Sequence, residues 1–309
     1  MLPLIVLVGP TGAGKTTLAL SIAERFRGEV VNCDSLQLYR GFDIGAAKLP
    51  EADRRGIPHH MIDVLEPNRG YSAGDYARDA RQTIAAISER EKLPVLAGGT
   101  GFYLRALWNG LPQLPSRDDA LRNDLASRET ARPGAIHRLL HRLDPDAARR
   151  IHSRDTQKLI RALEIRLLTR QSAPPADSAK PLAGYRALTI GLAPDRAVLY
   201  EILDARAREM FRCGLLEEVE NLLAAGATGA EKPFESLGYK QTLKFLRGSI
   251  SLEEAIASTQ LETRQYAKRQ MTWFRRDPAT IWLQGFGHEP DIIDQSCALV
   301  HSFIMNTGA

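Results

Sequence analysis

The stretch of sequence that decides the fold runs from residue 9 to residue 16 and reads Gly9-Pro10-Thr11-Gly12-Ala13-Gly14-Lys15-Thr16. It fits the phosphate-loop pattern G-x-x-x-x-G-K-[ST]. An apolar run, residues 2–8, comes directly before it, and apolar residues at helical spacing, from Leu18 to Phe26, come after it. This context predicts a buried strand, a tight loop and a helix that begins near Lys15.

The residue types of this loop suit a bound diphosphate. Glycines let backbone N–H groups close around phosphate oxygens, and the N-terminus of a helix carries partial positive charge. Lys15 is expected to reach the outer phosphate, and the Thr16 hydroxyl suits Mg²⁺. We therefore expect all eight residues of the loop to bind a diphosphate, with Mg²⁺ as the cofactor and Thr16 as its ligand.

Outward from the loop, strand and helix patterns alternate. Residues 29–33 have the pattern of a buried strand that ends at Asp34, residues 71–91 have helical spacing, and residues 94–97 form a third apolar run before Gly98. A β-α-β rhythm of this kind is typical of a parallel sheet with helices on both faces. The sequence thus predicts an α/β fold, with a phosphate-loop parallel sheet flanked by helices.

The rhythm breaks after residue 115. Helical segments without strand signals follow up to Arg170, residues 173–179 have the composition of a linker, and residues 187–192 return as a strand. We therefore expect a catalytic core of residues 1–115 and 185–309, mostly helical toward its C-terminus, interrupted by an all-helical insertion of residues 116–184.

The positive charge of the chain is concentrated in this insertion. Residues 117–170 contain 13 Lys and Arg against 8 Asp and Glu, whereas the net charge of all 309 residues is only +4. A basic module on a near-neutral body is compatible with a polyanionic partner. On charge alone, a solvated helical face explains the same pattern equally well.

Composition places the protein in a broad class. Hydrophobic residues make up 44% and charged residues 25%, which is typical of a soluble globular protein. No apolar run approaches the roughly 18 residues of a membrane helix, so we expect no membrane association. The three cysteines, which show no metal-binding spacing, suit a reducing cytoplasm and are expected to be buried small residues.

The acidic residues at strand ends argue against a simple ATPase. A phosphate-loop NTPase usually holds Mg²⁺ with an acidic residue at the end of a buried strand. The strand at residues 94–97 ends in Gly98-Gly99-Thr100-Gly101 instead, and Asp34 is the only acidic candidate at a strand end. The loop alone does not say whose diphosphate it holds.

Four further segments carry a family resemblance. They are Asp34-Ser35-Leu36-Gln37-Leu38-Tyr39-Arg40-Gly41-Phe42-Asp43-Ile44-Gly45-Ala46-Ala47-Lys48, Pro58-His59-His60-Met61-Ile62-Asp63, Gly98-Gly99-Thr100-Gly101-Phe102-Tyr103 and Arg264-Gln265-Tyr266-Ala267-Lys268-Arg269-Gln270-Met271-Thr272-Trp273-Phe274. In this order and together with the loop, they resemble the tRNA dimethylallyltransferase family. The resemblance extends to about Arg276, and the absence of a C-terminal Cys/His cluster matches the short bacterial form.

The resemblance implies a reaction and its partners. Members move a dimethylallyl group from dimethylallyl diphosphate to the N6 amine of the adenosine just 3′ of the anticodon (tRNA position 37). The loop would hold that diphosphate rather than drive ATP hydrolysis. We accordingly expect the anticodon stem-loop of tRNA as a partner, a cytoplasmic location and a monomer.

The resemblance also implies roles for particular residues. Asp34 would take the proton from the amine and Thr100 would orient the base, although a helix cap near Ser35 and a cap of the next helix are the structural alternatives. Arg122 is a candidate for tRNA contact or, alternatively, a solvated arginine. The implied tRNA-binding set is Asp34, Ser35, Leu36, Gln37, Thr100, Arg122, Gln157, Lys158, Leu159, Ile160 and Arg161.

Three further features are open to two interpretations. On the helix near residues 263–276, basic side chains at Arg264, Lys268 and Arg275 share a face, which favours an RNA-facing helix with Tyr266 and Trp273 packed inward; a purely structural helix is the alternative. The pair at residues 59–60 is a pocket wall or loop rather than a metal site. Glu235 stands where some relatives have a basic residue, so it is given no diphosphate role.

Two other functions remain as rivals at this stage. An ATP-dependent small-molecule kinase would share the phosphate loop and Mg²⁺ but transfer a γ-phosphate. A non-catalytic RNA-binding regulator would bind tRNA and leave the adenosine unmodified.

Overall fold

The computed structural model describes residues 1–112, 114–115, 117–172 and 180–306 and divides the chain into two compact units. The first comprises Met1–Trp108 and Leu182–Ala309, and the second comprises Asn109–Pro181. The second unit thus begins before residue 116 and ends before residue 184, the limits expected from sequence. The linker predicted at residues 173–179 lies outside the described residues.

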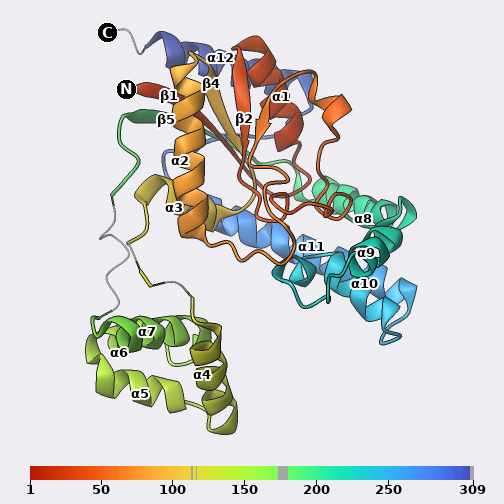
Figure 1. Ribbon diagram of the computed structural model, residues 1–309. Coiled ribbons are helices and arrows are strands. Elements are labelled where there is room, and N and C mark those ends of the chain that lie inside the picture. Colours follow the sequence, from red (N-terminus) through yellow and green to blue (C-terminus); the bar gives the residue numbers. More distant parts are fainter. Residues whose placement is uncertain (113, 116, 173–179, 307–309) are drawn as a thin grey trace. The chain divides into compact units, whose positions relative to one another are not determined.

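The first unit is built on a six-stranded sheet in the order β3-β2-β4-β1-β5-β6. Figure 1 labels β1, β2, β4 and β5 of this sheet. Every neighbouring pair of strands is parallel. The strands are β1 (Leu2–Val8), β2 (Gly28–Asn32), β3 (His59–His60), β4 (Leu93–Ala97), β5 (Tyr185–Leu192) and β6 (Ile281–Leu283). The predicted α/β fold class is confirmed. All strands point the same way, so the loops after their carboxyl ends share one edge of the sheet.

Side chains of β1 alternate between two cores. Ile5 and Leu7 pack with residues of α1 (Lys15–Arg25) and α12 (Pro290–Met305). Val6 and Val8 face the opposite side, where they border a narrow apolar gap with Leu104 and Phe274. This period of two is the geometry of a strand that is buried on both faces.

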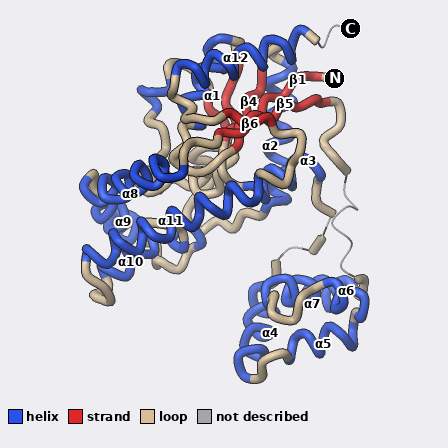
Figure 2. Tube along the Cα trace, turned by 180° about the vertical axis from the view of Figure 1, so that it is seen from behind, coloured by secondary structure: helices blue, strands red, loops and turns tan. Residues whose placement is uncertain are grey.

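Helices cover both faces of the sheet, as Figures 1 and 2 show. On the side opposite α1 and α12, α2 (Ala73–Glu89) buries Tyr76, Ile84 and Ile87 against β2 and β4. The Ser72 hydroxyl accepts from the backbone N–H of Asp75, whose carboxylate accepts from the backbone N–H of Ser72. This capping box explains why the helix begins at Ala73.

The remaining helices of the first unit follow β4 and β5. They are α3 (Gly101–Asn109), α8 (Arg196–Arg212), α9 (Leu215–Ala224), α10 (Tyr239–Leu246) and α11 (Leu252–Phe274), with short 3₁₀ turns at Glu51–Arg54 and Lys232–Glu235. Helix α11 packs along α8 and α10. The mostly helical C-terminal part expected from the sequence is therefore present.

The second unit has its own core, and its described residues form a bundle of four helices. The helices are α4 (Asp119–Ala131), α5 (Ala135–Leu143), α6 (Pro145–Arg150) and α7 (Thr156–Thr169). Fully buried Leu125, Leu140 and Leu163 pack together in its centre. Turn-forming residues set two of the helix starts: Gly134 precedes α5 in a left-handed conformation, and the Asp144 side chain caps α6.

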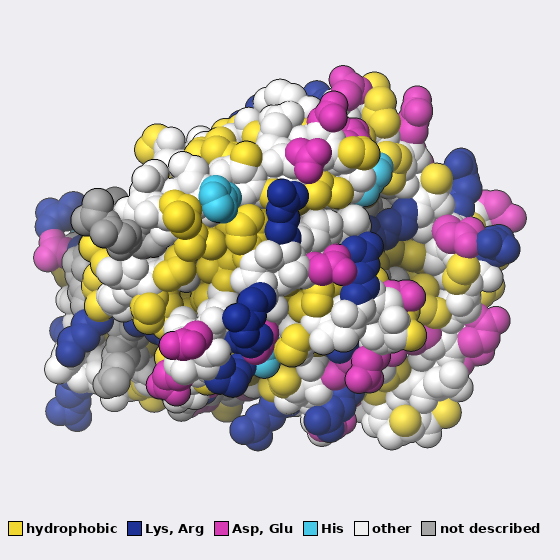
Figure 3. All heavy atoms as spheres, turned by 90° about the horizontal axis from the view of Figure 1, so that it is seen from above, with side chains coloured by type: hydrophobic (Ala, Val, Ile, Leu, Met, Phe, Trp, Pro, Cys, Tyr) yellow, Lys and Arg dark blue, Asp and Glu magenta, His cyan; other side chains and the backbone are white. Residues whose placement is uncertain are grey.

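Surface features agree only partly with the sequence. Cys33 and Cys297 are buried, but Cys213 is exposed at the end of α8, so the expectation of three buried cysteines is wrong for that residue. On the face shown in Figure 3, basic and acidic side chains are interspersed rather than gathered by sign. Within the described ranges, no helix is both long and apolar enough to cross a membrane.

Candidate active site

The phosphate loop connects β1 to α1 in the predicted place. Gly12 and Gly14 have φ angles of 80° and 84°, a region that side-chain-bearing residues seldom adopt. A Cβ atom on Gly14 would lie 2.9 Å from the backbone nitrogen of Gly287, so the loop also passes too close to its neighbour for a side chain. The first turn of α1 contains no acidic residue. No side-chain carboxylate within that turn therefore offsets the partial positive charge at the N-terminus of α1.

Lys15 is folded back on its own loop. Its ammonium group donates to the carbonyl oxygens of Gly9, at 3.0 Å, and Pro10, at 2.7 Å. Burial lowers the pKa of Lys15 to about 8, an effect that Asp34 opposes and the positive charge of Arg206 reinforces. Lys15, Asp34 and Arg206 therefore lie close enough to interact electrostatically, although they come from three different segments.

Asp34 is held in a turn directly after β2. Its backbone N–H donates to Asn32 Oδ1 at 2.9 Å, and its own Oδ1 accepts the backbone N–H of Leu36 at 2.9 Å. No helix begins at Ser35. The carboxylate thus closes a local turn with one oxygen rather than capping a helix, which was the structural alternative.

Thr100 joins the ends of β2 and β4. Its hydroxyl oxygen accepts the backbone N–H of Ser35 at 3.0 Å, and its own backbone N–H donates to the carbonyl of Cys33 at 3.0 Å. Its backbone carbonyl, not its side chain, accepts from Tyr103 and Leu104 at the start of α3. The hydroxyl is therefore directed to the Asp34–Ser35 segment, so the two expected catalytic residues belong to one connected structure.

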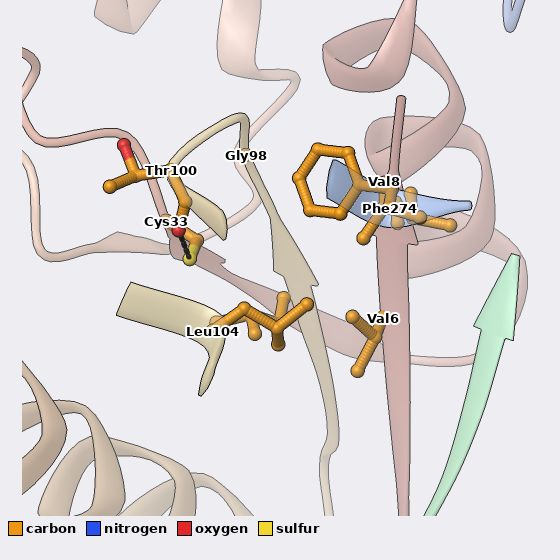
Figure 4. A pocket seen from close by; sticks show the side chains of 9 residues that line it. Val6, Val8, Cys33, Gly98, Thr100, Leu104 and Phe274 are labelled. Carbon is orange, nitrogen blue, oxygen red and sulfur yellow. Dashed lines mark hydrogen bonds between the residues drawn. The ribbon is translucent and has the colours of Figure 1, made fainter. Parts of the chain in front are cut away.

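Glycines let the turn at residues 98–101 pack closely on its surroundings. A Cβ atom on Gly98 would lie 2.2 Å from the carbonyl of Cys33, and one on Gly101 would lie 2.3 Å from the Trp273 ring. Figure 4 shows Thr100, Cys33 and Gly98 on one side of the narrow apolar gap, Val8 and Phe274 across from them, and Val6 and Leu104 below. The gap among these residues is too small for a water molecule, and burial raises the pKa of Cys33 to about 12. The floor beneath Thr100 is therefore dry and apolar.

The structure adds residues that the sequence did not indicate. Gln270 of α11 accepts the backbone N–H of Thr11 at 2.8 Å and donates to the carbonyl of Gly99 at 2.9 Å. Burial raises the pKa of Tyr266, and the nearby negative charge of Asp34 acts in the same direction. Although residues 266 and 270 lie in a recognised motif, only the packing of α11 shows that they reach the loop.

Arg206 was missed for a similar reason. It lies on α8, whose sequence has no loop or strand-end signal. Burial lowers the pKa of Arg206, and the negative charge of Asp34 partly offsets that effect. A half-buried guanidinium beside Lys15 and Asp34 adds a second cation to the site.

The segment after Asp34 serves mainly to shape the site. The Gln37 side chain donates to the carbonyl of Ala46 at 3.1 Å, which fastens the 34–48 loop on itself. Ser35 and Leu36 are half-buried and contribute the backbone N–H groups that bind Thr100 and Asp34. The roles of Ser35, Leu36 and Gln37 in tRNA binding stay predictions.

In the second unit, the two candidate arginines share one internal acid. Arg122 donates to both carboxylate oxygens of Glu164 at 2.8 Å, and Arg161 pairs with the same carboxylate and donates to the carbonyl of Pro115 at 3.0 Å. Glu164 is fully buried, and these contacts lower its pKa to about 2 even though its burial acts in the opposite direction. Arg122 is therefore not the solvated arginine of the structural alternative.

The other residues of the 157–161 segment differ in exposure, because they lie on different faces of α7. Gln157 and Lys158 are exposed, Ile160 is half-buried against the core, and Leu159 is fully buried in it. The expectation that the Leu159 side chain contacts tRNA is corrected on this ground, because it packs inside the bundle. The exposed pair remains accessible to an outside partner.

The basic helix face expected near residues 263–276 is partly used internally. Arg264 pairs with Asp204 of α8, whereas Lys268 and Arg275 are exposed. Trp273 was expected to pack inward, but it lies over Gly101 and remains 36% exposed. Tyr266, by contrast, is half-buried.

Two remaining expectations concern other polar groups. His59 Nδ1 lies 2.8 Å from the carbonyl of Ile57, and His60 Nε2 lies 2.7 Å from Glu29 Oε2. Both histidines belong to the short strand β3, and in the described part of the chain no three His, Cys, Asp or Glu residues gather as metal ligands. Glu235 pairs with Lys232 at the surface.

These features define a class of protein: an α/β enzyme whose phosphate loop, strand-end acid and threonine turn meet at one edge of a parallel sheet. The family model described as IPP transferase matches residues 37–277. A curated tRNA dimethylallyltransferase from Solibacter usitatus is 55% identical, over 98% of this chain and 99% of its own. The chain belongs to the IPP transferase family, as the sequence resemblance indicated.

Other relatives support the same assignment. A tRNA dimethylallyltransferase from Koribacter versatilis is 48% identical over 96% of this chain and 97% of its own. The solved tRNA isopentenylpyrophosphate transferase of Bacillus halodurans is 35% identical with a TM-score of 0.72 and covers 99% of this chain and 96% of its own. A eukaryotic dimethylallyltransferase, solved acting on tRNA, is 27% identical with a TM-score of 0.83 and covers 99% of this chain and 80% of its own.

Proposed function

We propose that this chain transfers a dimethylallyl group from dimethylallyl diphosphate to the N6 amine of the adenosine 3′ to the anticodon of tRNA. The observation that carries the proposal is the convergence at one sheet edge. Lys15 of the phosphate loop interacts with Asp34, and Asp34 lies in the turn that Thr100 holds. An anion-binding loop beside a proton acceptor is the arrangement that this reaction requires. The relatives from Solibacter usitatus and Koribacter versatilis are named tRNA dimethylallyltransferases, which supports the dimethylallyl group and the tRNA substrate.

The loop side of the site binds the leaving diphosphate. The backbone N–H groups of residues 9–16 and the N-terminus of α1 present partial positive charge to phosphate oxygens. Lys15 at the start of α1 and Arg206 of α8 each add a positive charge. As the bond between the allyl carbon and oxygen breaks, negative charge accumulates on the diphosphate, and these groups stabilise it.

The residues present also fit Mg²⁺. The ion prefers oxygen ligands, and the Thr16 side chain is exposed on the first turn of α1. Asp34 supplies a carboxylate near Lys15, which lies in the first turn of α1 together with Thr16. Thr16, with Asp34 nearby, would hold the ion against the diphosphate, where it would neutralise part of the charge of the leaving group.

Asp34 accepts the proton of the attacking amine. One oxygen, Oδ1, is engaged by the Leu36 N–H, and this fixes the orientation of the carboxylate. The N6 nitrogen forms a bond to the allyl carbon, the carbon–oxygen bond to diphosphate breaks, and one N6 proton passes to Asp34. The Thr100 hydroxyl accepts the Ser35 N–H and donates to Ser35 Oγ at 3.4 Å. That second bond is long, so the hydroxyl would exchange it for a ring nitrogen of adenine when the base is bound.

Recognition of tRNA requires the target base to leave its stack. Extrusion costs a few kcal/mol and is least costly in a single-stranded loop. The exposed Gln157 and Lys158 of the helical unit suit contacts with the anticodon stem-loop. The proposal includes action as a monomer in the cytoplasm, where tRNA is available.

The test is direct. Purified protein is incubated with unmodified tRNA, Mg²⁺ and dimethylallyl diphosphate, and the digested RNA is examined by mass spectrometry for a prenylated adenosine. The expected result is one prenylated adenosine per tRNA, next to the anticodon. A parallel incubation with γ-labelled ATP tests the kinase, which the family match and the relatives do not favour. Binding of tRNA without any product would instead indicate the RNA-binding regulator.

A further inference from the structure

Gln270 connects two segments of the site that are far apart in sequence. It lies on α11, is 5% exposed, and forms one hydrogen bond through each end of its amide. Oε1 accepts the backbone N–H of Thr11 at 2.8 Å, and Nε2 donates to the carbonyl of Gly99 at 2.9 Å. An amide carries its acceptor and its donors on two separate atoms, so it can bind both partners at once.

The contact with Gly99 restricts the position of the Gln270 amide, which bridges Thr11 and Gly99. A Cβ atom on Gly99 would lie 2.1 Å from Gln270 Nε2, so the amide lies directly against the backbone of the turn. The two partners also fix the orientation of the amide, because the carbonyl of Gly99 accepts and the N–H of Thr11 donates. Tyr266, one helical turn earlier, lies beside the same contact, because a Cβ atom on Gly99 would be 3.9 Å from its hydroxyl oxygen.

The two bridged segments have different tasks in the proposed reaction. Thr11 belongs to the loop that holds the diphosphate of the prenyl donor. Gly99 directly precedes Thr100, which orients the acceptor base. Both segments are rich in glycine, and glycine backbones are conformationally permissive. The pairing of β1 with β4 fixes the bases of both segments, up to the pair Leu7 and Ala97. Gln270 ties the two segments together beyond the ends of these strands.

We propose that Gln270 is a positioning residue that sets the separation between prenyl donor and acceptor amine, an assignment that rests on the proposed function. Reaction between two bound molecules depends steeply on their distance and alignment, and a misplacement of about 1 Å costs roughly 100-fold in rate. A residue that ties the donor loop to the acceptor turn therefore acts on the rate of reaction more than on the affinity for either substrate.

Three variants separate this role from general stability. Gln270→Met keeps the size of the side chain and removes both hydrogen bonds. Gln270→Glu keeps an acceptor for the Thr11 N–H but places an oxygen against the Gly99 carbonyl. The matched control is Gln260→Met, because Gln260 is a buried glutamine of the same helix whose amide donates to the Asp204 carbonyl, away from the loop.

The measurements are kcat and both KM values, with hydrogen exchange of the Thr11 amide. For Gln270→Met we expect kcat to fall about 10- to 100-fold, with each KM within about threefold of wild type. Gln270→Glu should also lose kcat. The Thr11 amide should exchange faster in Gln270→Met but not in Gln270→Glu. Gln260→Met should lower thermal stability and leave the kcat of the folded protein unchanged.

Several outcomes would overturn the proposal. One is a kcat for Gln270→Met within twofold of wild type, and another is an equal loss in Gln260→Met. Full activity of Gln270→Glu, or a raised KM for dimethylallyl diphosphate at unchanged kcat, would show that Gln270 acts on the loop alone. If Gln270→Met does not fold, Gln270→Glu decides between these results. A wild-type protein that forms no prenylated adenosine overturns the proposed function itself, and Thr11 exchange then decides whether the bridge exists.

Discussion

Lys15 in the α/β unit and the arginine pair of the helical unit, Arg122 and Arg161, are cations that the sequence marks for anionic ligands, but their surroundings differ. Lys15 rests on neutral carbonyl oxygens, and burial lowers its pKa. The arginines share the fully buried carboxylate of Glu164. A cation that lacks a full counter-charge gains much from a bound phosphate, whereas a cation already paired gains less. Similar residue types therefore suit the proposed diphosphate binding in one unit and stabilise the internal structure of the other.

The largest expected effect comes from the acid beside Lys15. Asp34→Asn keeps an oxygen for the Leu36 N–H but removes the proton acceptor. We expect prenyl transfer to fall about 10²- to 10⁴-fold, the usual range for loss of a general base. The measurement is the initial rate of prenylated adenosine formation, with tRNA binding as the control. Near-normal turnover would remove Asp34 from the mechanism.

The second effect tests the charge of Lys15. Its pKa of about 8 lies below the ordinary value of 10.5, so the ammonium loses its proton as the pH rises through about 8. We expect kcat/KM for dimethylallyl diphosphate, which reports the free enzyme, to fall above that pH. Lys15→Met should cost about 10²- to 10³-fold in activity. The variant serves as its own control, since its remaining activity should not show the decline that begins near pH 8.

The third effect concerns the buried acid of the helical unit. Removing one partner of a buried ion pair costs about 3–5 kcal/mol, so Glu164→Gln should destabilise that unit by this order. The folded pKa of Glu164, about 2, lies below its ordinary 4.5. Its contribution is therefore complete above about pH 4.5 and is lost as the pH falls toward 2.

Hydrogen exchange in α4 and α7 measures this change. Asp124→Asn is the matched control, because Asp124 forms an exposed pair with Arg128, and such pairs contribute about 0.2–1 kcal/mol. Equal protection in Glu164→Gln and wild type would contradict the internal role of the arginine cluster.

The smallest effect distinguishes the exposed Lys158 from the half-buried Arg161 on the same helix. Lys158 is 73% exposed, so Lys158→Ala should weaken tRNA binding and lower the slope of log affinity against log salt by about one. Arg161→Ala should destabilise the helical unit instead. Asp155→Asn removes the partner of Lys158 and keeps a helix cap, so it should not weaken binding. An unchanged salt slope in Lys158→Ala would exclude Lys158 from the RNA contact.

The parts of the site that follow strands could be predicted from sequence. The loop at residues 9–16 has a fixed pattern, and Asp34 and Thr100 each follow an apolar run at the end of a strand. Carboxyl ends of parallel strands share an edge, so their proximity follows from the β-α-β rhythm. The same reasoning placed the helices on both faces of the sheet.

Contacts made by helices were beyond that reasoning. Gln270 and Arg206 reach the loop only because α8 and α11 pack beside it, and periodicity does not say which neighbour a helix face meets. Glu164 was also not foreseen as the partner of both arginines, because a buried acid has no distinct sequence signal. Leu159 was expected among the tRNA-binding residues because the whole 157–161 segment was assigned together. The helix directs its side chain into the core of the bundle.

The close packing of the turn at Gly98 on Cys33 also matters for redesign of the enzyme. With no side chain between them, the ends of β2 and β4 are joined almost as one rigid piece, and this piece carries both Asp34 and Thr100. Enlarging the space between these two residues would require breaking the sheet itself. Efforts to accept a bulkier alkyl donor should therefore change side chains on α8 and α11, where single substitutions reshape the site without disturbing the strands.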